Sequence, residues 1–229
     1  MIDHVRDLAS VRDATERLLS AAAKLDNVSV AEPSRLPGWS RGHVLAHLAR
    51  NADALVNVLE GRPMYASGDA RDNDIERDAP RALDVQLTDV RESAARFQEA
   101  GAAPADWSRT VELRNGVTDS AARVPFRRWI EVELHHVDLG IGYELEDLPE
   151  EFVAREIDFL ADRFSGHPEA PATRVTDGTR AWSTGRVTEG GPEVIVTGAS
   201  PALLGWLAGR RDGADLSVDG GPLPGLPPL

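Results

Sequence analysis

The chain of 229 residues contains no cysteine. Disulfides, thiolate metal ligands and a cysteine nucleophile are therefore excluded. Any metal that this chain binds must be held by nitrogen and oxygen ligands. If the protein carries out thiol chemistry, the sulfur has to arrive on a cofactor.

Positive charge and long apolar segments are also scarce. The chain has 25 Lys and Arg against 38 Asp and Glu, a formal net charge of −13 at pH 7, which repels polyanions. The apolar runs are short and interrupted by charge, and residues 1–10 (MIDHVRDLAS) lack the apolar segment of a signal peptide. We expect a cytoplasmic protein that binds neither nucleic acid nor membranes. We also expect a monomer rather than an oligomer.

Apolar periodicity predicts four amphipathic helices in the first two thirds of the chain. Apolar residues recur at spacings of three and four in residues 3–25, 40–60, 80–100 and 125–141. The polar, turn-rich residues 66–79 predict a long loop, and residues up to about 120 after the third helix are ambiguous. We expect Pro80 to open the third helix. Four amphipathic helices with mostly short connections favour a bundle.

The composition changes after residue 148. Residues 149–164 predict one more helix, and the segments beyond it are richer in Gly, Thr and Val. The later segments predict a hairpin over 173–184 about Asp177-Gly178, a strand over 192–198, a helix over 200–211 and a strand over 214–220. We therefore expect an α+β protein, with a four-helix bundle over residues 1–148 and a smaller α+β domain over 149–229 that includes the bridging helix.

Two of the predicted helices carry titratable side chains beside their apolar faces. An α-helix advances about 100° per residue, so positions four apart share a face. Glu131 and His135 have this spacing, as do His47 and Asn51 in another helix. Facing helices could bring His47, Glu131 and His135 around one metal, with His43 as the second choice to His47. This donor set suits Zn²⁺ and leaves a fourth position open, as in catalytic sites.

Other interpretations of the same spacings stay open. Glu131 could form an i,i+4 ion pair with Arg127 on a wet surface, and a histidine beside an apolar face could simply pack. His136 lies about 100° from His135 around the helix, so both cannot face one metal. We therefore assign His136, together with Glu133, to a solvated edge or to packing.

Three segments together resemble the mycothiol-dependent maleylpyruvate isomerase family: residues 42–53 (GHVLAHLARNAD), 127–140 (RRWIEVELHHVDLG) and 203–210 (LLGWLAGR). The resemblance covers nearly the whole chain. It implies a DinB-like metal-binding four-helix bundle followed by a small α+β domain, with metal ligands at His47, Glu131 and His135. It also implies conversion of maleylpyruvate to fumarylpyruvate, in which the metal-bound thiolate of mycothiol adds to the double bond, allows rotation and leaves.

The resemblance assigns further residues to the site. Arg210 matches a family arginine expected to bind substrate or cofactor anions at the cleft between the domains, and we assign it a catalytic role. Its alternative role is to stabilise the carbonyls at the end of a helix. Asp138 and Asn51 share faces with the ligands and are expected to hold imidazoles in place beside the cofactor. Packing or surface hydration would explain Asp138 and Asn51 equally well.

Two other functions fit the same residues. One is a mycothiol S-transferase that detoxifies electrophiles, which needs the same metal and thiolate but a different acceptor pocket. The other is a non-catalytic binding module stabilised by zinc. The open coordination position argues against the binding module.

Overall fold

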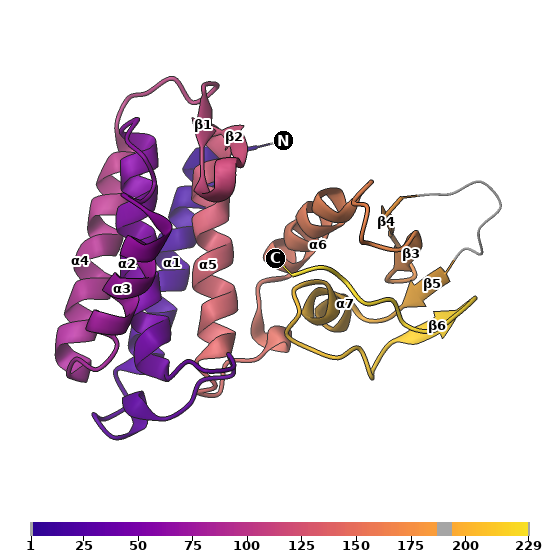
Figure 1. The fold of residues 1–229 in the computed structure, drawn as a ribbon, viewed down its shortest axis with the longest axis horizontal. Helices are drawn as coiled ribbons and strands as arrows, with labels where there is room; N and C mark the ends of the chain where they lie inside the picture. The colour runs from indigo at the N-terminus through magenta and orange to yellow at the C-terminus, as the bar shows by residue number, and fades with distance from the viewer. Residues whose placement is uncertain (1, 187–193, 229) are drawn as a thin grey trace. The chain divides into compact units, whose positions relative to one another are not determined.

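The protein divides into two compact units, Met1–Tyr143 and Glu144–Leu229. The computed structural model describes residues 2–186 and 194–228. The first unit is helical and the smaller second unit contains a sheet, so the predicted α+β class is confirmed (Figure 1). Among the described residues, no helix combines the length and the apolar character that crossing a membrane requires.

Four long helices lie side by side in the first unit (Figure 1). They are α1 (His4–Ala22), α2 (Arg41–Leu59), α4 (Leu83–Ala102) and α5 (Val124–Asp138). Helix α2 packs against α4 and α5, and α1 packs against α4 and α5, around a core that includes the buried Leu18, Leu48 and Phe97. Ser40 caps α2 by accepting a hydrogen bond from the backbone N–H of His43. The bundle predicted from the apolar periodicity is thus present.

The long loop predicted over residues 66–79 is wrong, because this segment forms helix α3 (Gly68–Asp78). The side chain of Ser67 caps the helix, and Ile75 is buried. Asp78 is also buried and forms ion pairs with Arg77 and Arg81. Pro80 follows the end of α3 and does not open α4, which begins at Leu83. With so few apolar residues, α3 has almost no periodic signal, and it is held by capping, ion pairs and contact with α2.

The ambiguous segment after α4 forms a short hairpin. Strand β1 (Thr110–Glu112) pairs antiparallel with β2 (Thr118–Ser120). At the tip, Asn115 and Gly116 have φ values of 59° and 72°. Asparagine and glycine are the residues that adopt this left-handed conformation most readily, which explains the turn.

A close contact between helices α2 and α3 gives a test of the packing. A Cβ atom added at Gly42 would lie 2.3 Å from the carbonyl oxygen of Ala79, whereas one at Gly68 would meet nothing within 4 Å. We expect Gly42→Ala to lower the free energy of unfolding by about 1–3 kcal/mol relative to Gly68→Ala, as overpacking does. Urea denaturation measures both variants. Equal stability of the two would contradict the contact.

The second unit combines two helices and a four-stranded sheet. The helices are α6 (Glu150–Phe164) and α7 (Ser200–Leu207), and the strands are β3 (Thr173–Thr176), β4 (Ala181–Thr184), β5 (Val194–Thr197) and β6 (Ser217–Asp219). The strand order is β4-β3-β5-β6, with β3 and β5 parallel and the other pairs antiparallel. The predicted hairpin and strands are confirmed, except that Pro192 and Glu193 lie outside the described residues. Helix α7 is shorter than predicted, with Gly209 in the left-handed conformation just beyond it.

Candidate metal centre

Three side chains from two helices meet inside the bundle. The Nε2 atom of His47 on α2 lies 2.8 Å from Oε2 of Glu131 on α5, and Nε2 of His135 lies 3.2 Å from the same oxygen. One donor atom from each of the three residues lies within 4.8 Å of the others. The side chain of His47 is 7% exposed and that of Glu131 is 31% exposed. The cluster is therefore open to solvent on the Glu131 side.

Packing of the apolar faces fixes the rotation of both helices. Val44 and Leu48 flank His47 on α2, and Leu134 precedes His135 on α5; all three are buried. Because side chains leave a helix at fixed angles, burying these residues turns His47 and His135 toward the contact between α2 and α5. The imidazole rings lie 4.6 Å apart, at 79° to each other.

Asp138 holds the ring of His135. Its Oδ2 atom lies 2.8 Å from Nδ1 of His135, and its side chain is 1% exposed. A proton on Nδ1 would donate to this carboxylate and leave Nε2 as the atom available to a metal. The contact expected of a residue that orients an imidazole is therefore present.

We expect Asp138→Asn to weaken metal binding by about 10- to 100-fold, because an amide neither carries the charge nor favours the same tautomer. Competition with a chelator of known affinity measures the change. Asp13→Asn, at an exposed position on α1, is the matched control. Unchanged affinity in Asp138→Asn would show that the aspartate only packs.

Asn51 lies one turn along α2 from His47, but its hydrogen bond goes to an arginine. Its Oδ1 atom accepts from Nη1 of Arg128 at 2.7 Å. Arg128 is fully buried, and within the described part of the chain its Nε and Nη2 atoms have no hydrogen-bond partner. Burial lowers the pKa of Arg128 to about 10, opposed by the charge of Glu131. Arg128 is thus a buried cation beside the centre; the cofactor role of Asn51 stays a prediction.

Helix α3 adds a second arginine that the sequence analysis missed. Nη2 of Arg71 lies 3.3 Å from Nδ1 of His47, and Arg71 also interacts electrostatically with Tyr65. The guanidinium can only donate, so His47 accepts at Nδ1 and its Nε2–H donates to Glu131. Because residues 66–79 are predicted to form a loop, no position can be predicted for Arg71. The helix that this segment forms places Arg71 beside α2.

Burial and hydrogen bonding shift the pKa of each of the three residues in the cluster. Burial, reinforced by the charge of His135, lowers the pKa of His47 to about 4. Burial also opposes the charged form of His135, but hydrogen bonds to Asp138 and Glu131 outweigh it and raise its pKa. Burial would raise the pKa of Glu131, yet hydrogen bonds from both histidines hold it well below its usual value. The cluster therefore presents an ionised carboxylate and an uncharged His47, whereas the raised pKa of His135 favours a proton that metal binding would release.

These shifts predict how the stability of the metal-free protein depends on pH. Between pH about 6.5 and about 4, unfolded His47 binds a proton that folded His47 does not, so the free energy of unfolding falls as pH falls. The raised pKa of His135 acts oppositely and contributes stability that is lost as pH rises. We expect His47→Gln to reduce the acid-side slope in urea denaturation of metal-free protein. The same dependence of the unfolding free energy on pH in both proteins would contradict the lowered pKa of His47.

The other two histidines singled out from the sequence serve structural roles. Nδ1 of His43 accepts a hydrogen bond from the backbone N–H of Ser40 at 3.2 Å and completes a capping box at the start of α2. His136 is buried and stacks on Tyr143 at 4.0 Å. Glu133 is fully buried. Of the two roles left open for His136 and Glu133, the structure therefore shows packing.

The two arginines singled out from the sequence have close contacts elsewhere. Arg127 forms an ion pair with Asp119 of the hairpin at 2.7 Å, whereas the carboxylate of Glu131 contacts the two histidines. Nη1 of Arg210 donates to the carbonyl oxygen of Ala208 at 2.8 Å, the contact expected of an arginine at a helix end. Its anion-binding role stays a prediction.

Comparisons with known proteins cover both units. The family model "Mycothiol maleylpyruvate isomerase N-terminal domain" matches residues 11–140, and "MDMPI C-terminal domain" matches residues 147–228. The crystal structure of a mycothiol-dependent maleylpyruvate isomerase is similar, with a TM-score of 0.89 and 25% sequence identity over 99% of this chain and 97% of that one. A variant of that enzyme with one histidine replaced by alanine matches equally well. A search of curated proteins finds no match. The chain belongs to the mycothiol maleylpyruvate isomerase family.

Proposed function

We propose that this protein is a metal- and mycothiol-dependent isomerase that converts maleylpyruvate to fumarylpyruvate. One observation carries the proposal: His47, Glu131 and His135 form a compact donor cluster inside a chain that matches both domains of the family. The similar solved enzyme is named for this activity and for its dependence on mycothiol. The absence of cysteine agrees with a thiol supplied from outside.

The donor set fits a divalent metal. Two imidazole nitrogens and one carboxylate oxygen are the ligands that Zn²⁺ takes in catalytic sites with an open position. The low pKa of Glu131 and the hydrogen bond that His135 donates to Asp138 prepare these ligands. A metal held there would supply a Lewis acid that lowers the pKa of a thiol. Mycothiol would supply the nucleophile whose addition and loss permit rotation about the double bond.

Arginine side chains of the protein would stabilise the negative charge of the reactants. Arg71 contacts His47, and the buried Arg128 lies close enough to interact with the charge of Glu131. The two guanidinium groups place positive charge beside Glu131 in a protein whose net charge is −13. Such a site favours a thiolate and an anionic substrate. We include Arg210 as a further anion-binding residue.

The test is an absorbance assay of maleylpyruvate with purified protein. We expect turnover only when both mycothiol and a divalent metal are present, and loss of turnover after chelation that Zn²⁺ restores. Turnover without thiol would refute the mechanism. Mycothiol adducts with other electrophiles, without isomerisation, would assign the protein as an S-transferase instead.

A further inference from the structure

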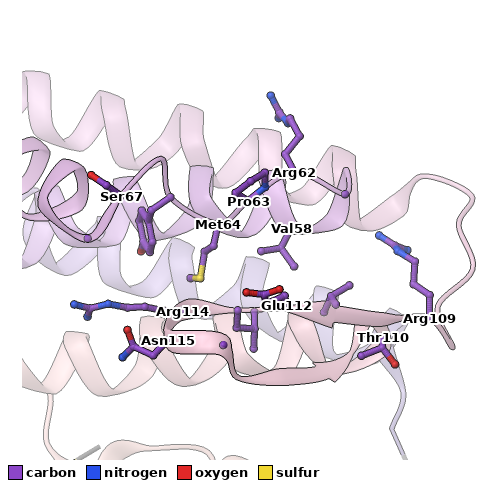
Figure 2. Close-up of a pocket in the computed structure, with 16 residues that line it drawn as sticks. Val58, Arg62, Pro63, Met64, Ser67, Arg109, Thr110, Glu112, Arg114 and Asn115 are labelled. Atoms are coloured by element: carbon purple, nitrogen blue, oxygen red, sulfur yellow. The ribbon is translucent and has the colours of Figure 1, made fainter.

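The first unit has a cavity of about 690 Å³ away from the three-residue cluster. It lies between residues 61–68, where the chain passes from α2 into α3, and the β1–β2 hairpin (Figure 2). Its volume is within the range of about 300–1,000 Å³ found for small-molecule sites. Met64 and Val58 project into it from one side and Glu112 from the other. A cavity of this size and lining can hold a small molecule of defined chemistry.

Tyr65 connects the cavity to the metal centre. Tyr65 lines the cavity and interacts electrostatically with Arg71, which in turn contacts His47. The charges of Glu131 and Arg114 also act on Tyr65. Arg71 and Tyr65 therefore lie between the metal centre and the cavity.

The lining of the cavity combines hydrogen-bond donors, acceptors and apolar surface, which suits a hydroxyl-rich group. Arg114 offers hydrogen-bond donors, Glu112 offers acceptors, and Met64 and Val58 offer apolar surface. Figure 2 shows the side chains of Arg114 and Asn115 extending along the cavity away from Arg109. Within the described residues, the Arg114 guanidinium forms no hydrogen bond or ion pair. Arg62 and Arg109 also line the cavity. Sugar hydroxyls can both donate to Glu112 and accept from Arg114.

We propose that this cavity binds the carbohydrate end of the thiol cofactor. Mycothiol carries its thiol on a cysteine that is joined by an amide to an amino sugar and an inositol, so the sulfur and the polyol lie at opposite ends. The sulfur end would lie at the metal centre, and the polyol end would lie past Tyr65 between Glu112 and Arg114. This inference rests on the proposed function and adds a specificity site to it.

Binding of two thiols to the metal-loaded full chain tests the inference. N-acetylcysteine has the sulfur end alone, and mycothiol has both ends. We expect Arg114→Met, which removes a charged donor, to weaken mycothiol binding about tenfold and to leave N-acetylcysteine unchanged, as measured by calorimetry. Met64→Trp, which fills the cavity, should act in the same direction. Arg12→Met, an exposed position on α1, is the control.

The outcomes separate this site from the proposed function. Weaker binding of mycothiol alone supports the cavity as the carbohydrate site. Unchanged binding of both thiols by Arg114→Met and Met64→Trp, or equal weakening of both, overturns it while the proposed function stands. If the unaltered protein with metal binds neither thiol, the proposed function fails, and this inference fails with it.

Discussion

His47→Ala and His135→Ala should each lose the bound metal. Each substitution removes one of only three donors, and the Glu131 carboxylate and the remaining imidazole cannot by themselves hold a cation tightly. We expect metal affinity to fall by at least about 100-fold, more than the loss of a residue that only orients a ligand causes. Elemental analysis should show about one divalent ion per chain in the unaltered protein and little in either variant. Isomerase turnover should be lost with it.

His43→Ala is the matched control for this experiment. His43 lies one turn from His47 on the same helix, but its ring belongs to the cap at Ser40. We expect the His43 variant to retain its metal, at some cost in helix stability of about 0.5–2 kcal/mol. Full metal in His47→Ala or His135→Ala would remove that residue from the ligand set. Loss of metal in His43→Ala, with the fold intact by circular dichroism, would add His43 to it.

Glu133→Ala should have the largest effect on stability. This carboxylate is 0% exposed and accepts hydrogen bonds from Nε1 of Trp129 at 3.0 Å, from the hydroxyl of Tyr143 at 2.8 Å and from Nη2 of Arg17 at 2.5 Å. Its removal leaves the indole N–H without that acceptor inside the bundle. Arg17 is 42% exposed and can be rehydrated, so we expect a loss near the lower end of the range of about 3–5 kcal/mol for broken buried pairs.

Two variants isolate the cause of this loss. Glu133→Gln keeps an acceptor and should cost less than Glu133→Ala, whereas Glu16→Ala, at an exposed position on α1, should change the free energy of unfolding by no more than about 0.5 kcal/mol. Urea denaturation measures all three. We expect folded Glu133→Ala to retain its metal, because Glu133 faces Arg17 and Trp129. Stability equal to that of Glu16→Ala would show that the buried network contributes nothing.

Helical spacing accounts for the part of the centre that the sequence predicted most directly. Glu131, His135 and Asp138 lie within two turns of one helix, and a helix fixes the directions of residues that are three and four apart. The predicted bundle has the same origin, since apolar residues repeat with the helical period along α1, α2, α4 and α5. The absence of cysteine by itself restricts the metal ligands to nitrogen and oxygen atoms.

Contacts between distant segments depended on the tertiary structure. His47 is 84 positions from Glu131 along the chain, and only the packing of α2 against α5 brings them to hydrogen-bond distance. Helix α3, which places Arg71 beside His47, is stabilised by ion pairs and by contact with α2. Neither the ion pairs nor this contact leaves an apolar periodicity in the sequence. Arg128 looks like any helical arginine in the sequence, and its burial against Asn51 makes it part of the centre. A residue's direction from its own helix is a local property, but its neighbour across the bundle is set by how all the apolar faces pack together.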